Sequence, residues 1–394
     1  MATLTFQRHS VAGDDHWHSI LISLLRGFAA IQVAAAHLRG ELFPGLSTLA
    51  NPPLLYKGFA FATGFAHHAV LVFFVISGWL VGGSLLDKLR QPDAFSHYAI
   101  DRVTRLWTVL IPTFVLTLLF GHAAGVVGAP GIDFAAANDH SATAFAGNLV
   151  GLQTIVLPCF GNNFALWSLA NETWYYVMFP LLVAICCARR RVARLACVAA
   201  LAVLLAWLPA AILGYFAVWL LGAGFSRIRI DCGAAMRIVW MVLLAAVAVY
   251  YRVAGDMDSY DLTTLGPDLA CSLVFLVLLS GMQFKAPAAS RLAAPLARLG
   301  KAVSDFSFSL YVMHLPLLGL MVHWGRSRFG LRQLSPSEPL HYALYFGMLA
   351  MLLAGAWLTW RLFESQTYRL RRLAKRLLLQ RRPPAAAVAA LRVD

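Results

Sequence analysis

An arginine and a histidine lie inside one apolar stretch near the start of the chain. Arg26 and His37 both fall within residues 20–38, with ten residues between them. Eleven positions along an α-helix turn through about 1100° and rise roughly 16 Å, so the two side chains share one helix face at two depths. A cation in the hydrocarbon costs about 2.5–3.5 kcal/mol on insertion scales, so it persists mainly where it faces a bundle interior or a cavity. This helix face is the leading candidate site.

The imidazole of His37 is a candidate general base. A neutral imidazole can accept a proton from an attacking hydroxyl group, and burial favours the neutral form. The alternative is a histidine that only hydrogen-bonds between helices, and an isolated intramembrane histidine would favour that structural role. The co-facial Arg26 argues for chemistry instead.

Arg102 and Arg105 lie three positions apart at the expected cytoplasmic entry of another apolar stretch. They therefore share one helix face, and two guanidinium groups together can grip a phosphate bidentately. The alternative is that both are ordinary basic residues flanking a membrane span. Arg26, about two turns into its own helix from the same side, would extend the basic patch inward.

Glu172 begins a fourth apolar stretch within an aromatic-rich segment, residues 165–176. We expect it near the outer surface, where its carboxylate could orient His37 or hold an acceptor sugar on which Trp167 and its aromatic neighbours stack. The alternative is an interfacial aromatic belt, with the Glu172 charge stabilised near a helix N-terminus.

Other polar side chains in or beside the apolar stretches are weaker candidates. His314 lies near the middle of a stretch, where a structural and a catalytic role are equally consistent with the sequence. Glu364 is expected to pair with Arg361 or with arginines of the inner loops. His67 and His68 stand at the edge of a loop and have no partner that the sequence reveals.

The composition indicates an integral membrane protein. The 394 residues are 60% hydrophobic and 13% charged, and the mean hydropathy of +0.70 exceeds that of ordinary soluble proteins. A helix needs about 20 residues to cross the hydrocarbon core. The sequence predicts an all-α polytopic fold with about ten transmembrane helices, at residues 20–38, 66–86, 106–127, 166–187, 192–208, 210–226, 236–252, 266–283, 303–323 and 341–363. The fifth and sixth stretches meet at Pro209 and can also be read as one broken hairpin.

The distribution of basic residues predicts the orientation. With the N-terminus inside, 24 of the 32 Lys and Arg residues fall in inner segments, as expected for cytoplasmic loops. Both termini are therefore predicted to be cytoplasmic. The net charge of +14 is spread over six inner segments, so topology and anionic lipid explain it and no nucleic-acid partner is expected.

One membrane domain is expected, at residues 20–365, between a cytoplasmic segment at 1–19 and a basic, partly disordered cytoplasmic tail at 366–394. Turn signals at residues 51–53, 128–131 and 138–140 predict ordered outer loops. No cleavable signal peptide is evident. The six cysteines show neither a disulfide framework nor a zinc pattern, so no metal is expected.

Six short segments together resemble motifs of the acyltransferase 3 family of membrane-bound acyltransferases. The first-helix signature is matched by residues 24–30 with His37, the second-helix motif by residues 73–80 and the paired arginines by residues 102–105. Residues 167–172, 307–316 and 363–364 are similar to the family's later motifs. The matches occur in order from about residue 20 to 365.

The resemblance implies transfer of an acyl group, commonly acetyl from acetyl-CoA, to a hydroxyl group of a glycan or another envelope molecule. It implies that His37 is the essential histidine, Arg26 its partner, and Arg102 and Arg105 the donor-side arginines. The motif matches also make site candidates of Glu172, Trp167, Asn171, Tyr311, His314 and Glu364. Two features depart from the family pattern: Glu364 is followed by Ser-Gln and not by Arg-Pro, and no hydrolase-like domain is fused to the chain.

The leading hypothesis is an O-acyltransferase of a cell membrane, most simply a bacterial inner membrane, with acyl-CoA as donor and a saccharide as acceptor. The rival is a transporter or flippase of an acyl group or a lipid-linked sugar, but the sequence has no repeat symmetry of the kind many transporters show. A non-catalytic envelope scaffold leaves the intramembrane ionisable residues unexplained. The sequence leaves open the identity of the acceptor, the identity of the acyl group and the oligomeric state. It also leaves open whether the acceptor attacks the donor directly or an acyl-histidine forms first.

Overall fold

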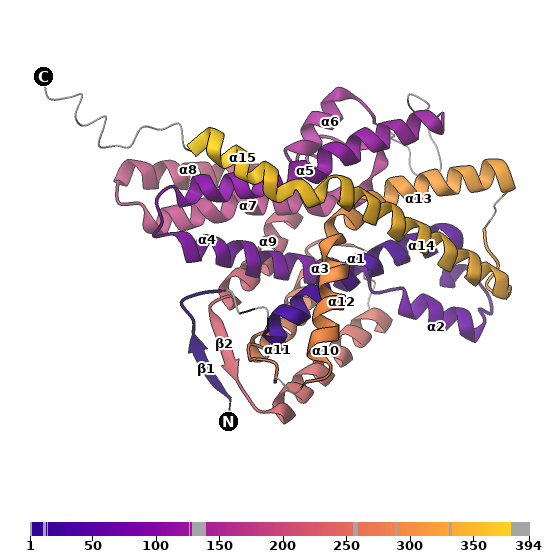
Figure 1. Ribbon diagram of the computed structural model, residues 1–394, viewed down its shortest axis with the longest axis horizontal. Coiled ribbons are helices and arrows are strands. Elements are labelled where there is room, and N and C mark those ends of the chain that lie inside the picture. Colours follow the sequence, from indigo (N-terminus) through magenta and orange to yellow (C-terminus); the bar gives the residue numbers. More distant parts are fainter. Residues whose placement is uncertain are drawn as a thin grey trace, which may run out of the picture.

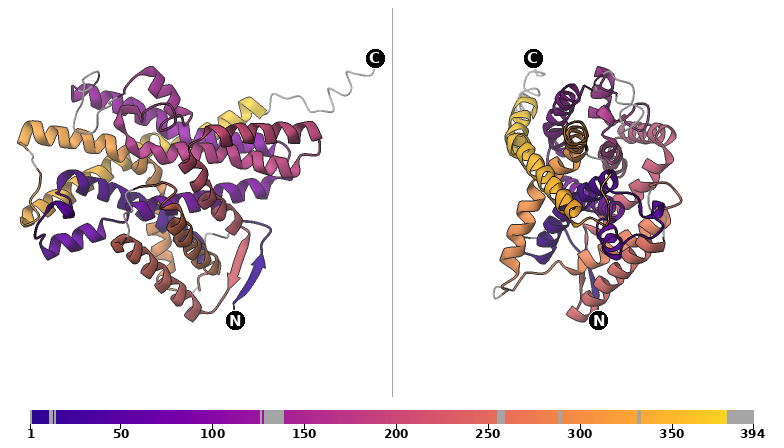
Figure 2. Two further views of the ribbon diagram at one scale, coloured as in Figure 1. Left: turned by 180° about the vertical axis from the view of Figure 1, so that it is seen from behind. Right: turned by 90° about the vertical axis from the view of Figure 1, so that its right-hand side faces the viewer.

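The computed structural model describes residues 2–10, 13, 15–125, 127, 139–254, 259–287, 290–330 and 333–379. Helices of several inclinations surround α1 (Trp17–Leu42), and a two-stranded sheet lies at one edge beside the N-terminus (Figures 1 and 2). The predicted turn at residues 128–131 and the predicted tail from residue 380 lie outside the described residues.

The all-α polytopic fold is confirmed, because each predicted apolar stretch is helical. The remaining helices over these stretches are α3 (Ala66–Ser77) with η2 (Gly78–Gly82) and α4 (Gly83–Lys88), α5 (Ala94–Ala123), α7 (Trp167–Cys187), α8 (Arg191–Trp207), α9 (Ala210–Phe225), α10 (Ala234–Ala254), α11 (Leu265–Gly281), α13 (Ser307–Phe329) and α14 (Pro339–Leu362). In the described part of the chain, seven helical segments are long and apolar enough to cross a membrane. The count of ten spans and the cytoplasmic termini stay predictions.

Several elements were not predicted. The amphipathic helix α12 (Ala293–Asp305) packs across α1, and α15 (Thr367–Leu379) continues the line of α14 and packs along α5 (Figure 1). The other short elements are η1 (Leu46–Thr48), α2 (Leu54–Ala62), α6 (Ala142–Leu149), η3 (Phe160–Asn162), η4 (Phe164–Leu166) and η5 (Glu364–Gln366).

The N-terminal segment is attached to the loops between helices. β1 (Thr3–Phe6) pairs antiparallel with β2 (Ile228–Asp231), so that Thr3 faces Asp231 across the ladder. Asp15 contacts Lys285, with the Nζ atom 2.9 Å from Oδ2. The hydrogen bond from Lys285 lowers the pKa of Asp15.

Glycine residues allow the closest helix contacts around α3. A Cβ atom at Gly78 would lie 2.0 Å from the carbonyl oxygen of Trp219, and one at Gly222 would lie 2.2 Å from that of Val75. No side chain fits at either distance, so the backbones of α9 and of the α3–η2 segment approach directly. Gly78 and Gly222 therefore serve helix packing.

The position of α8 contrasts with that of α9. None of the α8 residues is buried, whereas α9 buries Tyr215, Val218 and Trp219 completely. Helix α8 ends at Trp207 and α9 begins at Ala210, so α8 and α9 form two separate helices on either side of Pro209. Because the α8 surface is apolar and exposed, it is suited to contact lipid acyl chains.

The segment between α5 and α7 folds back into the bundle. Asn163 Nδ2 donates a hydrogen bond to the carbonyl oxygen of Val312 at 2.7 Å, and Gln153 Nε2 donates one to that of Leu166 at 3.0 Å. The ring of Phe164 packs edge-on against His37, with ring centroids 5.1 Å apart. Helix α7 therefore begins beside His37, and its second turn, with Glu172, reaches deeper into the bundle.

Candidate active site

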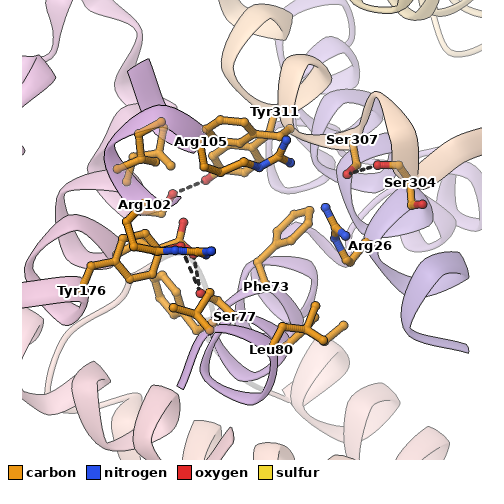
Figure 3. Close-up of a pocket in the computed structure, with 18 of the residues that line it drawn as sticks. Arg26, Phe73, Ser77, Leu80, Arg102, Arg105, Tyr176, Ser304, Ser307 and Tyr311 are labelled. Carbon is orange, nitrogen blue, oxygen red and sulfur yellow. Dashed lines mark hydrogen bonds between the residues drawn. The ribbon is translucent and has the colours of Figure 1, made fainter. Parts of the chain in front are cut away.

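A cavity of about 420 Å³ lies inside the bundle, between α1, α3, α5, α7 and α13. Figure 3 shows the guanidinium groups of Arg26, Arg102 and Arg105 around this space. The charged and hydroxyl-bearing residues of its wall are Arg26, Ser77, Arg102, Arg105, Ser168, Glu172, Tyr176, Ser304, Asp305, Ser307, Tyr311, Glu364 and Arg371. Among them are six of the predicted site residues, brought together from four helices and η5.

The arginines of the cavity differ in their partners. Arg105 Nη1 donates a hydrogen bond to Glu364 Oε1 at 2.5 Å. Glu364 was expected to pair with Arg361 or with another arginine, and its partner is Arg105. Among the described residues, Arg26 and Arg102 make no salt bridge. Arg102 lies over the ring of Tyr176, 5.7 Å from its centroid, and its Nε atom is buried without a hydrogen-bond partner.

Glu364 is held firmly at the inner end of the cavity. Its second carboxylate oxygen, Oε2, accepts hydrogen bonds from the backbone nitrogen of Ser309 at 3.0 Å and from Ser309 Oγ at 2.6 Å. The residue is only 4% exposed. Three hydrogen bonds on one carboxylate fix the position of Arg105, so these two residues form a rigid part of the wall.

Glu172 lies in the cavity wall, at the second turn of α7. Its Oε1 atom accepts hydrogen bonds from Ser77 Oγ and from Tyr176 OH. Ser77 in turn accepts a hydrogen bond from Trp219 Nε1 at 3.1 Å. The carboxylate therefore joins α3 to α7, and the partner of His37 is a different residue.

His37 and His314 meet although 277 positions separate them. His37 Nδ1 lies 2.8 Å from His314 Nε2, and the planes of the two rings are nearly parallel, with an interplanar angle of 11°. Neither histidine belongs to the wall of the cavity. Tyr311 connects the two regions, because its side chain lines the cavity while its carbonyl oxygen lies 2.7 Å from His314 Nδ1.

Two further predicted residues, Trp167 and Asn171, are not part of the cavity wall. The ring of Trp167 packs against Tyr260 at a centroid distance of 4.4 Å, and Asn171 is 4% exposed inside the bundle. The stacking platform predicted at Trp167 is therefore occupied by Tyr260.

Arg371 is a cavity residue that the sequence analysis missed. It projects from α15, and its Nε atom lies 3.5 Å from Asp101 Oδ1, while Lys375 Nζ lies 2.6 Å from the same oxygen. The sequence does contain a signal for the helix that carries Arg371, because Leu370, Leu373 and Leu377 recur with helical periodicity among basic residues. We interpreted this segment only as a tail.

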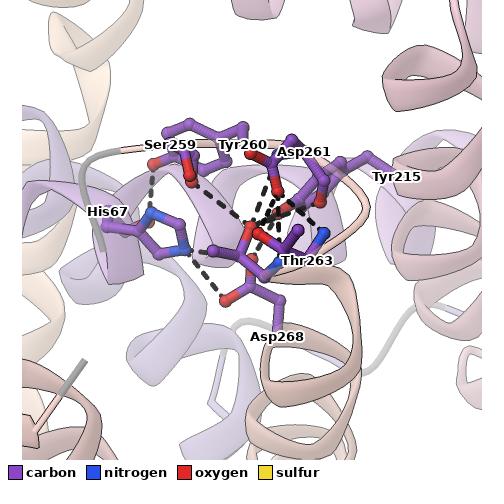
Figure 4. A network of polar contacts seen from close by, with 8 residues as sticks. His67, Tyr215, Ser259, Tyr260, Asp261, Thr263 and Asp268 are labelled. Carbon is purple, nitrogen blue, oxygen red and sulfur yellow. Dashed lines mark hydrogen bonds and ion pairs between the residues drawn. The ribbon is translucent and has the colours of Figure 1, made fainter. Parts of the chain in front are cut away.

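A second buried polar network lies outside the cavity and joins α3, α9 and α11 (Figure 4). His67 Nε2 lies 2.9 Å from Asp268 Oδ1, and Tyr215 OH donates to Asp268 Oδ2 at 2.5 Å. The ring of Tyr260 stacks on His67 at 4.1 Å. The interpretation of His67 as a loop-edge residue without a partner was wrong, because its partner comes from a helix 201 positions away.

A bundle of long apolar helices around a charged internal cavity defines a multi-pass membrane protein with an internal polar site. Residues 20–361 match the family model Acyl_transf_3, described as an acyltransferase domain, and the chain belongs to this acyltransferase 3 family. The protein is thus a membrane acyltransferase. No curated protein and no solved structure matches the chain.

Proposed function

We propose that the protein moves an acyl group, most simply acetyl, from cytoplasmic acyl-CoA to a hydroxyl group of a saccharide at the extracytoplasmic side of a bacterial inner membrane. The observation that carries this proposal is the pair Arg26 and Arg102. Both cations face an internal cavity without a salt-bridge partner among the described residues. Unpaired charge inside a bundle is costly, so a site that keeps it is suited to an anionic ligand.

The donor suits the cavity in size and in charge. About 420 Å³ is within the range of small-molecule sites, and the phosphate groups of CoA are natural partners for guanidinium forks. Arg102, Arg105 and Arg371 would bind these phosphates, with Arg105 positioned in advance by Glu364. The pantetheine arm would then extend past Tyr311 toward His37.

His37 would supply the base. It takes the proton of the acceptor hydroxyl group while the hydroxyl oxygen attacks the thioester carbonyl carbon, and the C–S bond then breaks to release CoA. Arg26, about 16 Å along the same helix face, would stabilise negative charge on the donor side. Glu172, bonded to Ser77 and Tyr176, would hold the cavity wall in shape.

The test is acyl transfer by purified protein in lipid vesicles, supplied with radiolabelled acetyl-CoA and a polysaccharide extract from cells lacking the protein. We expect His37→Ala to lower transfer by about 10²–10⁴-fold, the usual contribution of general base catalysis. His122→Ala is the matched control, because His122 is exposed at the end of α5. Retained transfer in His37→Ala would refute the assignment, and a label that is relocated without forming an O-acyl ester would identify a carrier.

A further inference from the structure

The hydrogen bonds of His314 determine which of its ring nitrogens carries a proton. Its Nδ1 atom lies 2.7 Å from the carbonyl oxygen of Tyr311 and 3.2 Å from that of Leu310. Carbonyl oxygens only accept hydrogen bonds, so Nδ1 must be the donor. The side chain is completely buried, and its described contacts contain no carboxylate, so the ring is neutral.

The tautomer of His37 follows from that of His314. With its proton on Nδ1, a neutral His314 presents a lone pair at Nε2, and this atom lies 2.8 Å from His37 Nδ1. His37 must therefore donate through Nδ1, which leaves its own Nε2 unprotonated. The edge-on ring of Phe164, 5.1 Å away, limits rotation of the His37 ring out of this arrangement.

We propose that His314 is a positioning residue that holds His37 in the tautomer whose Nε2 atom is free to accept a proton. This inference rests on the proposed function, and it names the reacting atom and the direction of attack. The acceptor hydroxyl approaches the Nε2 edge of His37, an Nε2–H bond forms as the O–H bond breaks, and the oxygen electron pair attacks the thioester carbon. The departing thiolate then takes the proton back from His37.

His314 also stabilises the intermediate charge on His37. When Nε2 takes a proton, His37 becomes an imidazolium, and its Nδ1–H bond to the His314 lone pair becomes a charge-assisted hydrogen bond. His314 keeps both backbone hydrogen bonds throughout, so no proton leaves it. The two imidazoles thus work as an orienting pair in which His37 alone exchanges a proton with the acceptor.

Two substitutions at position 314 separate positioning from packing. The side-chain oxygen of Gln reaches the place of the histidine Nε2 atom and can accept from His37, whereas Asn reaches only the place of Nδ1. We expect His314→Asn to lower kcat by roughly 100-fold or more and His314→Gln by less than about tenfold. The KM for acetyl-CoA should be unchanged in both, because His314 lies outside the cavity wall. Equal kcat values in the two variants, or a better His314→Asn, would overturn the proposal.

A second measurement needs no acceptor and no activity. In protein labelled with ¹⁵N-histidine and reconstituted in lipid, the His37 Nδ1 signal should be that of a protonated nitrogen and the Nε2 signal that of an unprotonated one. A coupling across the hydrogen bond should join His37 Nδ1 to His314 Nε2, with His314→Gln and His37→Asn used for assignment. A proton on His37 Nε2 would refute the inference even if the enzyme is active. The expected tautomer in a protein without acyl transfer would instead refute only the proposed function.

Discussion

Two buried polar clusters in the same bundle differ in how their charges are balanced. In the network of His67, Asp268 and Tyr215, both carboxylate oxygens of Asp268 accept hydrogen bonds, and none of these residues lines the cavity. In the cavity, Arg26 and Arg102 face open space without a salt bridge to any described residue. Residue types alone do not distinguish a binding site from a structural network. What distinguishes them is whether the protein itself supplies the partner.

This difference predicts opposite responses to mutation. A substitution in the Asp268 network strands buried polar groups, so its cost falls on stability. A substitution of an unpaired cavity arginine removes a charge that the fold does not need, so its cost falls on ligand binding. Stability and affinity measured on the same variants would therefore show whether the two clusters differ in this way.

The largest stability effect is expected at Asp268. Asp268→Ala leaves His67 Nε2 without its acceptor and leaves Tyr215 OH with only Thr264 Oγ1, 2.8 Å away. The stranded His67 group costs about 1–3 kcal/mol, and unfolding in detergent measures the loss. Asp268→Asn is the matched variant with a smaller loss, because it keeps one acceptor oxygen. Acetyl-CoA affinity of the folded fraction should not change. A stable Asp268→Ala protein with weakened affinity would instead assign the network to the binding site.

A smaller effect, on the binding of the acyl donor, is expected when Arg371 is replaced. Asp101 already contacts this arginine, so Arg371→Ala should raise the KM for acetyl-CoA by less than about tenfold. Arg376→Ala, on an exposed position of the same helix, is the control. If the KM for acetyl-CoA rises as much in Arg371→Ala as in Arg102→Ala, this would show that Asp101 releases Arg371 when the donor binds.

The sequence was sufficient to predict the helical membrane fold and half of the site. Arg26, Arg102 and Arg105 could be identified because a basic residue inside or at the entry of an apolar helix is rare enough to require a reason. The structure brings all three to one cavity through the packing of α1 against its neighbours.

The pairings could not be predicted, because they depend on tertiary contacts between distant segments. The sequence left a structural and a catalytic role for His314 equally open, and only the structure shows that it contacts His37. Glu172 was expected near a surface because α7 was assumed to start there. Hydrogen bonds such as that from Asn163 to the Val312 carbonyl draw the preceding segment inward, and neither partner shows a pattern in the sequence.

The central claim is that the unpaired arginines of the cavity serve a ligand and not the fold. The most direct test compares the dissociation constant for acetyl-CoA and the thermal stability of Arg102→Ala with those of wild type and of Arg90→Ala, an exposed arginine outside the cavity. We expect about 10–100-fold weaker binding in Arg102→Ala, from the loss of a charge-assisted hydrogen bond worth about 1.5–3 kcal/mol, with unchanged stability. Unchanged affinity together with a lower melting temperature would contradict it.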